Sequence, residues 1–428
     1  MAAFHAYRAT RRLAVRCGRR WGKTDFGKVI ACDRAMKGHP VGWFAPDYKV
    51  MSEAYNEIVD VLLPAKRSSS KMEGVIRTRT GGRIDFWTLE NDRAGRSRKY
   101  KDALIDEGAF TKPNMMAVWE QSIEPTLLDL GGRCVVMSNA NGVAPDNFFH
   151  QICTDPRFGF TEYHAPSEQN PYVPARRPGE ADEDWLARRA ATFAALKARS
   201  HPLVYRQEYG AEFVDFSGVA FFSRANLLDG DRPVAWPAGC DSVFAVIDSA
   251  VKSGKEHDGT AVSYWAYSSF GTHRLTCLDW DIVSIDGAML EAWVPSVFAR
   301  LEELARACRA RFGVQAVWIE DAQSGSILLQ QCALRGLDAQ ALPAVLTAAG
   351  KDARAINASG PVHRGEVKIS DFAHDKVVEF KGQARNHFMT QVFGFRVGDK
   401  QAATRADDLL DTFTYAVAVA LGDSGGIG

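Results

Sequence analysis

The sequence predicts an α/β protein that is built from two domains. Its 428 residues exceed the length of one ordinary domain. Short β-type runs alternate with helical segments along both halves, which is typical of largely parallel sheets covered by helices. Gly and Pro concentrate at 230–239, between two apolar stretches, and we expect a domain boundary there.

In the first half, runs rich in β-branched and aromatic residues predict strands at 13–17, 41–46, 83–89, 102–107 and 133–139. Helices are expected at 25–36 and 183–199. We expect the first domain to span 1–215, with a lid or linker part at about 165–215.

In the second half, the same patterns predict strands at 242–250, 260–267, 273–280 and 316–321, and helices at 287–312 and 406–421. We expect a linker at 216–239 and the second domain at 240–428.

The composition excludes several classes of protein. Hydrophobic residues make up 46% and charged residues 24%, as in soluble globular proteins. No apolar stretch reaches the ~18 residues of a membrane span, and the N-terminus lacks the apolar core of a signal peptide. The eight cysteines form no C-x-x-C pair, which argues against zinc ribbons and disulfide frameworks and favours a reducing cytoplasm. The 52 basic and 52 acidic residues exclude a uniformly basic coat for nucleic acid, although local basic stretches occur at 8–37 and 66–101.

The strongest local motif is Cys17-Gly-Arg-Arg-Trp-Gly-Lys-Thr24, which lies between a predicted strand and a predicted helix. This context suits a phosphate-binding loop, whose backbone N–H groups face phosphate oxygens at a helix N-terminus. Lys23 would reach the β- and γ-phosphates of ATP, and the Thr24 hydroxyl would ligate Mg²⁺. Cys17 stands where the usual motif has its first Gly, so an accidental Gly/Lys turn is the alternative.

Two arginines, Arg19 and Arg20, lie inside this loop. One of them could stabilise the charge on a transferring phosphoryl group. The alternative is a surface cation or a contact with DNA phosphate. We favour Arg19 for the catalytic role, because it is one position further from the Gly22-Lys23 pair.

Polar residues follow two further strands of the first half. Asp106 and Glu107 end an apolar run, where Asp106 would hold Mg²⁺ through water and Glu107 would polarise the attacking water. An edge strand that runs into a solvated turn is the alternative. Ser138 and Asn139 end another strand and would lie beside the γ-phosphate, although such a pair is also common in turns.

Three groups of carboxylates mark the second half: Asp248 at the end of one strand, Glu320 and Asp321 at the end of another, and Asp407, Asp408 and Asp411 at the start of the last helix. Each group alone is ordinary, since acids stabilise a helix N-terminus. An RNase H-like fold would bring the first strand, the fourth strand and a later helix together. Three acids would then converge on two divalent ions about 4 Å apart.

Taken in order, these motifs resemble those of the large terminase subunit of tailed bacteriophages, the motor and nuclease that packages DNA. The resemblance spans nearly the whole chain. Gly18–Thr24 is similar to the Walker A loop of the family, in which a non-Gly first position and an internal Arg are usual. Leu104–Glu107 resembles Walker B with the catalytic Glu, and Ser138–Ala140 resembles the coupling motif.

The resemblance continues into the second half. Arg206–Phe213 looks like the segment that closes the ATPase domain, and Asp248, Ile319–Gly325 and Asp407–Asp411 resemble the nuclease motifs. The catalytic residues that it implies are Glu107, Arg19, Asp248, Glu320 and Asp408. The residues that it implies for ATP binding are Gly18, Arg19, Arg20, Trp21, Gly22, Lys23, Thr24, Asp106, Ser138 and Asn139. Of the ambiguous nuclease ligands Glu320, Asp321, Asp407, Asp408 and Asp411, we favour Glu320 and Asp408.

The family implies an N-terminal P-loop ATPase domain of the ASCE type, a short linker and a C-terminal RNase H-like endonuclease domain. It implies ATP with Mg²⁺ as cofactor, and two Mg²⁺ or Mn²⁺ in the nuclease site. The implied partners are double-stranded DNA, a small terminase subunit and the portal protein of a procapsid, on which the subunits form a ring. A phage- or prophage-encoded chain of this kind works in the host cytoplasm, transiently at the portal, and is absent from the mature virion.

One departure concerns the N-terminus. Only sixteen residues precede Cys17, so we expect the upstream adenine-contacting segment of longer family members to be abbreviated here.

Two other classes of protein compete with this interpretation. An ATP-driven helicase or remodeller, whose second half only binds DNA, would carry further ordered motifs between 140 and 215, and none is found there. A structure-specific nuclease of the resolvase type would not need the phosphate loop and the acidic strand end of the first half.

Overall fold

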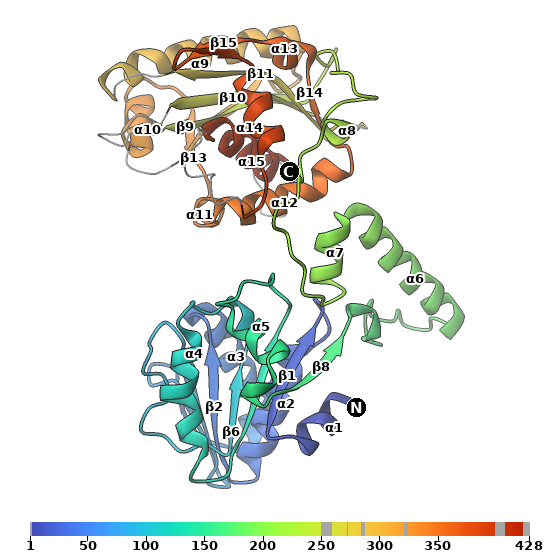
Figure 1. The fold of residues 1–428 in the computed structure, drawn as a ribbon, viewed down its shortest axis with the longest axis vertical. Coiled ribbons are helices and arrows are strands. Elements are labelled where there is room, and N and C mark those ends of the chain that lie inside the picture. Colours follow the sequence, from blue (N-terminus) through green and yellow to red (C-terminus); the bar gives the residue numbers. More distant parts are fainter. Residues whose placement is uncertain are drawn as a thin grey trace. The chain divides into compact units, whose positions relative to one another are not determined.

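The computed structural model describes residues 2–249, 259–271, 273–283, 287–320, 324–398 and 407–422. They form two compact units (Figure 1). Unit 1 contains Met1–Leu196 and Pro202–Asp215, and unit 2 contains Lys197–His201 and Phe216–Gly428. The segment 216–239, for which we expected a linker, is grouped with unit 2. No helix among the described residues is long and apolar enough to cross a membrane.

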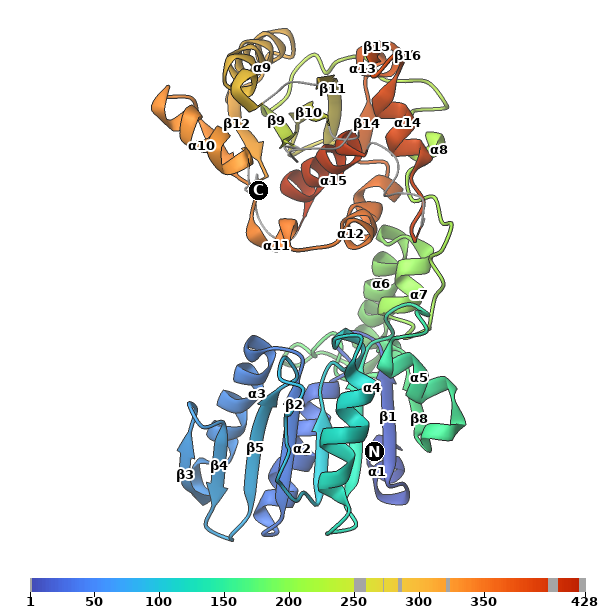
Figure 2. The ribbon, with the colours of Figure 1, turned by 60° about the vertical axis from the view of Figure 1, so that its left-hand side comes forward.

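Unit 1 is built on an eight-stranded sheet in the order β3-β4-β5-β2-β6-β7-β1-β8 (Figure 2). The strands are β1 (Arg12–Cys17), β2 (Pro40–Ala45), β3 (Lys66–Ser70), β4 (Val75–Thr78), β5 (Arg83–Thr88), β6 (Asp102–Ile105), β7 (Arg133–Ser138) and β8 (Thr161–Ala165). The strands from β5 to β8 in this order are parallel, and β3 and β4 extend the sheet as antiparallel strands at one edge. Because β7 lies between β1 and β6, the arrangement is that of an ASCE-type P-loop ATPase.

Helices cover both faces of this sheet. They are α1 (Ala2–Ala9), α2 (Lys23–Met36), α3 (Tyr48–Val61), α4 (Met115–Val118) and α5 (Phe148–Thr154). Two further helices, α6 (Asp182–Arg199) and α7 (Pro202–Glu208), follow β8 in the chain and extend away from the sheet (Figure 1). Alternate residues of a strand point to opposite faces. Leu13 and Val15 therefore join the core formed with α2 and α3, whereas Ala14 joins the core formed with α4 and α5.

Unit 2 is built on a six-stranded sheet in the order β13-β12-β9-β10-β11-β14. The strands are β9 (Ser242–Ser249), β10 (Thr260–Tyr267), β11 (Leu275–Val283), β12 (Val314–Ile319), β13 (Ala339–Ala341) and β14 (Val367–Ile369). The first three strands form an antiparallel meander, and β12 and β13 run parallel to β9. This order and these directions are those of an RNase H-like sheet.

Helices also cover both faces of the second sheet. The helices of unit 2 are α8 (Arg224–Leu227), α9 (Gly287–Ala307), α10 (Ser324–Leu334), α11 (Ala344–Thr347), α12 (Lys351–His363), α13 (Asp371–Asp375), α14 (His387–Gly394) and α15 (Asp408–Leu421), and β15 (Val378–Phe380) and β16 (Gln383–Arg385) form a small hairpin. Helices α9 and α15 pack against β9 from opposite faces, and α12 packs against α15. Tyr264 packs in the core under α9. The next residue, Trp265, lies 5.8 Å from the ring of Phe413 on α15.

Most predicted elements are confirmed, with shifted ends. The strand expected at 102–107 stops at Ile105, because Glu107 has a left-handed backbone with φ 48°. The helix expected at 287–312 stops at Ala307, close to the positive φ of Arg309. The last residue of the strand expected at 242–250 lies outside the described residues.

Candidate active sites

The loop after β1 is clamped from two sides. The Gly18 N–H donates to Ala165 O on β8 at 3.0 Å. A Cβ at Gly18 would lie 2.4 Å from both Ser167 Oγ and Tyr209 O, so only glycine fits. Gly22, at φ 95°, turns the chain into the first residue of α2. The loop amides, which would face a phosphate if one were bound, thus stand on a fixed backbone at a helix N-terminus.

Lys23 is buried at the start of α2. Its Nζ donates to Cys17 O at 3.1 Å and bonds Asn139 Oδ1. Burial lowers the pKa of Lys23, and the negative charge of Glu107 opposes this effect. The ammonium therefore lies inside the loop, where a triphosphate would be bound, and not in solvent.

Thr24 and Asp106 face each other across the ends of α2 and β6. Thr24 Oγ1 lies 3.4 Å from Asp106 Oδ1. The pKa of Asp106 is raised to about 7, mainly by burial and secondly by the negative charge of Glu107. Asp106 Oδ2 is buried and has no hydrogen-bond partner among the described residues. These hard oxygen donors have the chemistry that Mg²⁺ prefers, and the role of the two residues as its ligands stays a prediction.

Glu107 follows directly, in a backbone conformation that few residues other than glycine adopt. Its N–H donates to Asp106 Oδ1 at 3.1 Å, and its Oε2 accepts from Ser138 Oγ at 3.3 Å. Ser138 Oγ also accepts the Ala109 N–H at 3.1 Å. The ends of β6 and β7 therefore hold the Glu107 carboxylate between them.

Glu208, at the end of α7, is a site residue that the sequence did not reveal. Its Oε2 lies 2.5 Å from Arg19 Nε and accepts from Asn139 Nδ2 at 3.4 Å. The Arg19 N–H donates to Glu208 O at 2.8 Å. Lys23, Asn139, Glu208 and Arg19 thus form one chain of contacts. Glu208 lies within the segment Arg206–Phe213, which was predicted to close the ATPase domain. That prediction was the only feature of the sequence that pointed to this part of the chain.

The other two loop residues make contacts away from Lys23. The backbone O of Arg20 accepts from Asn170 Nδ2 at 2.6 Å, and its side chain is exposed. The Trp21 ring lies 5.7 Å from Tyr163 and 6.5 Å from Phe26. Neither contact assigns these two side chains to ATP binding, so that role stays a prediction.

In unit 2, the alternation of side chains places the strand-end acids on one face. Val243, Ala245 and Ile247 of β9 pack in the core under α9. Asp248 therefore points to the opposite face, toward α15. The same alternation along β12 buries Val317 and Ile319 under α9 and turns Glu320 to the other face.

Two contacts fix the position of helix α15, which carries the remaining acids at its start. Tyr415 Oη donates to Glu320 Oε1 at 3.1 Å, which ties α15 to the end of β12. Gln391 Oε1 on α14 accepts the N–H groups of Leu409 and Leu410 at 2.8 and 3.3 Å, so it satisfies the first turn of α15.

The pKa of Asp248 indicates that these acids lie near one another. Burial raises the pKa of Asp248 well above its usual value, and the charges of Asp411, Asp408, Glu320 and Asp407, in that order, raise it further. Asp321 lies outside the described residues.

Two cations on α12 reach the same acids, and the sequence did not reveal them. Arg354 Nη2 lies 2.5 Å from Asp411 Oδ1. Lys351 Nζ lies 3.4 Å from Asp411 Oδ2 and contacts Asp407 Oδ2. Both oxygens of Asp411 are therefore engaged by cations.

The acid cluster fits divalent cations by the chemistry of its donors. Carboxylate oxygens are the ligands that Mg²⁺ and Mn²⁺ prefer. Within the part of the chain that the structure describes, no three His, Cys, Asp or Glu side chains already stand in a group that could hold a metal ion.

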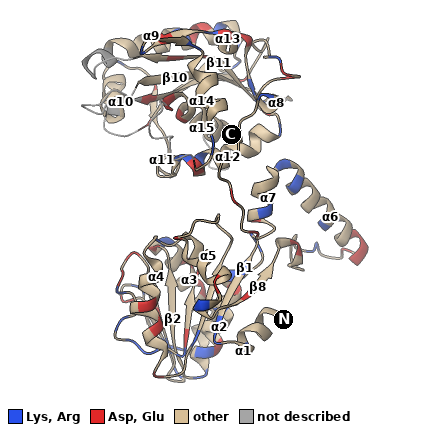
Figure 3. Ribbon diagram, in the orientation of Figure 1, with Lys and Arg blue, Asp and Glu red and all other residues tan. Residues whose placement is uncertain are grey.

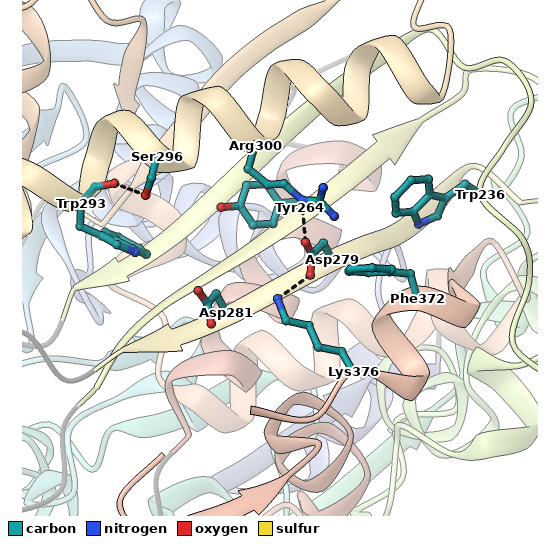
Figure 4. A pocket seen from close by; sticks show the side chains of 9 residues that line it. All are labelled: Trp236, Tyr264, Asp279, Asp281, Trp293, Ser296, Arg300, Phe372 and Lys376. Carbon is teal, nitrogen blue, oxygen red and sulfur yellow. Dashed lines mark hydrogen bonds and ion pairs between the residues drawn. The ribbon is translucent and has the colours of Figure 1, made fainter. Parts of the chain in front are cut away.

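A pocket of about 420 Å³ lies on the other face of the unit 2 sheet, beside α9 (Figure 4). Arg300 Nε and Lys376 Nζ approach the buried Asp279 from two sides, each at 2.8 Å. Trp236 and Phe372 form an aromatic wall next to them. Since the two cations are already paired with Asp279, and the strand-end acids lie on the opposite face, this pocket is not part of the acid cluster.

The two sheets have the strand orders and directions of a P-loop ATPase fold and of an RNase H-like nuclease fold. The sequence matches no family in a scan against known protein families, and a search of curated proteins finds no match.

Solved structures do resemble the chain. The large terminase from a thermophilic bacteriophage is similar at a TM-score of 0.60 and 12% identity, over 97% of this chain and 95% of that chain. For its complex with ATP-gamma-S, the TM-score is 0.60 and the identity 12%, over 95% of this chain and 94% of that chain. For its complex with ADP, the TM-score is 0.62 and the identity 11%, over 96% of this chain and 94% of that chain. The fold of this chain is that of a bacteriophage large terminase.

Proposed function

We propose that the chain is the large terminase subunit of a tailed bacteriophage. ATP hydrolysis in unit 1 drives double-stranded DNA into a procapsid, and a metal-dependent endonuclease in unit 2 cuts the concatemer. One observation carries this proposal. The same chain combines a buried loop lysine that faces strand-end acids on an ASCE-type sheet with an acid cluster on an RNase H-like sheet.

On the ATPase side, Lys23 binds the β- and γ-phosphates, and Thr24 and Asp106 hold Mg²⁺. When bound, Mg²⁺ neutralises charge on the phosphates. Glu107 accepts a proton from the attacking water, and its contact with Ser138 keeps the carboxylate in place. The Arg19 side chain leaves Glu208 and then stabilises charge on the γ-phosphate. Its side chain is 64% exposed, which leaves it room to move.

On the nuclease side, Asp248, Glu320 and an acid at the start of α15 bind two divalent cations. When bound, such a pair activates water and stabilises the leaving 3′ oxygen. Tyr415 orients Glu320 through the hydrogen bond at 3.1 Å.

The proposed partners follow from the packaging function. They are double-stranded DNA, a small terminase subunit that chooses the DNA, and the portal protein on which several copies form a ring. We propose that the protein works in the host cytoplasm and joins the procapsid only during packaging.

The test compares two variants of the full-length chain in two assays. Glu107→Gln should retain ATP binding and lose ATP turnover by at least ~100-fold, because the water loses its base while the loop persists. Asp248→Ala should lose plasmid cleavage with both Mg²⁺ and Mn²⁺. Each variant should retain the activity of the other unit.

The matched controls are Glu73→Gln and Asp371→Ala, which change exposed acids of unit 1 and unit 2. Both should show parental rates in both assays. Parental plasmid cleavage by Asp248→Ala would exclude the nuclease and favour a helicase or remodeller whose second half only binds DNA. Near-normal turnover by Glu107→Gln would remove Glu107 from the ATPase site.

A further inference from the structure

We propose that Lys351 and Arg354 are positioning residues of the nuclease site, which hold Asp407 and Asp411 and set the affinity of the acid cluster for divalent cations. This inference rests on the proposed nuclease function. It concerns a helix, α12, for which the sequence suggested no role.

The geometry connects both cations to the cluster. Arg354 Nη2 lies 2.5 Å from Asp411 Oδ1, and Lys351 Nζ lies 3.4 Å from Asp411 Oδ2. The Arg354 guanidinium also lies 4.6 Å from the ring centre of Tyr415. Since Tyr415 donates to Glu320, Arg354 is linked to acids on two elements of the site.

Burial distinguishes these contacts from ordinary surface ion pairs, which contribute little. The side chains of Arg354 and Asp411 are only 12% and 13% exposed. Charges in such a position are weakly screened and act strongly on one another. A divalent cation that approaches Asp411 must therefore compete with two resident cations.

The formal charges show why such residues would be useful. Five carboxylates act on one another here, Asp248, Glu320, Asp407, Asp408 and Asp411. When all five are ionised, as they would be with metal bound, they carry a formal charge of −5. Lys351 and Arg354 bring this to −3, and two divalent cations bring it to +1. A site of +1 attracts a phosphodiester, whereas the same site without the two side chains would stand at −1 and repel it. The cations thus weaken metal binding and favour DNA binding.

The experiment measures Mn²⁺ affinity calorimetrically on the full-length protein without DNA. Lys351→Gln and Arg354→Gln should each bind Mn²⁺ about tenfold more tightly, because one competing charge is lost at contact distance. Lys351→Arg keeps the charge and should restore the parental affinity. Lys381→Gln, on the β15–β16 turn, removes a charge outside the cluster and should leave Mn²⁺ affinity unchanged.

A second measurement separates positioning from a merely structural role. In plasmid cleavage at saturating Mn²⁺, Lys351→Gln should raise the KM for DNA at least fivefold, with a smaller effect on kcat. Unchanged Mn²⁺ affinity in both Gln variants, with only a lower melting temperature, would show that α12 simply anchors α15 and would overturn the inference. If the parental protein neither binds Mn²⁺ nor cuts DNA, the proposed function itself fails, and the inference fails with it.

Discussion

Arg19 is a loop residue whose side chain is held by an acid from another part of the chain. Its guanidinium pairs with Glu208, while its backbone N–H donates to the Glu208 carbonyl. The loop backbone and the side chain are therefore fixed by separate contacts. A change to the side chain should leave the phosphate-binding backbone in place.

Arg19→Ala should consequently lower kcat much more than it raises the KM for ATP, since a guanidinium at the γ-phosphate matters most as charge develops. Glu208→Gln should cause a smaller loss in the same direction, because Arg19 loses its anchor but keeps its charge. Steady-state ATPase kinetics test both variants. Arg67→Ala, at an exposed position on β3, serves as the control. A pure KM effect in Arg19→Ala would make Arg19 an ordinary phosphate contact.

At the scale of single elements, α12 shows where sequence patterns stop being informative. Its sequence contains Ser359, Gly360 and Pro361, which disfavour a helix interior. Burial of Ala355, Ala358 and Val362 stabilises the helix instead. The helix therefore depends on tertiary packing, which a local pattern does not contain.

The strands that carry the sites were predictable because their local sequence pattern is sufficient to identify them. β1, β6, β7, β9 and β12 are apolar runs that end in polar residues, and parallel strands bring such ends to one edge. Glu208, Lys351 and Arg354 sit on helices without such a signal. They reach their partners across 189, 56 and 57 residues, so no local spacing could reveal them.

His201, between α6 and α7, links the stability of unit 2 to pH. Its ring lies 4.7 Å from Phe221 and 5.7 Å from His363. Burial, and after it the positive charge of His363, lowers the pKa of His201 below that of an unfolded chain. The folded state therefore prefers neutral His201. This stabilisation is fully present above the unfolded pKa of about 6.5 and is lost as the pH falls through the lowered folded pKa.

Thermal unfolding measured from pH 7.5 to pH 5 should show a steady loss of stability. His201→Phe keeps a ring against Phe221 but cannot be protonated, so its melting temperature should fall less over the same range. His5→Phe changes an exposed histidine on α1 and should follow the parental curve. Parallel curves for the parent and His201→Phe would contradict the assignment.

At the scale of the whole molecule, charge predicts how DNA would be bound if the proposed function holds. The chain is formally neutral, and Lys and Arg are interspersed with Asp and Glu in both units (Figure 3). A packaging motor must also move along any sequence. We therefore expect contacts to the phosphate backbone through local basic groups, without readout of bases.

Affinity for duplex DNA should fall steeply as salt rises and should be equal for unrelated duplexes of the same length. Fluorescence anisotropy with two labelled duplexes of different sequence, measured from 50 to 200 mM salt, tests this expectation. A strong preference of this chain alone for one sequence would argue against it.

The clamp on the phosphate loop has a consequence for synthesis on the ribosome. Gly18 and Arg19 emerge early, but Ser167 and Glu208, which fix the loop together with Tyr209, follow 148 and 189 residues after Arg19. At about 5–20 residues per second, the loop waits roughly ten to forty seconds for them. A nascent chain stalled before residue 165 would thus carry the complete Gly18–Thr24 motif without the contacts that hold it. The ability to bind ATP should appear abruptly, once residue 209 has left the exit tunnel.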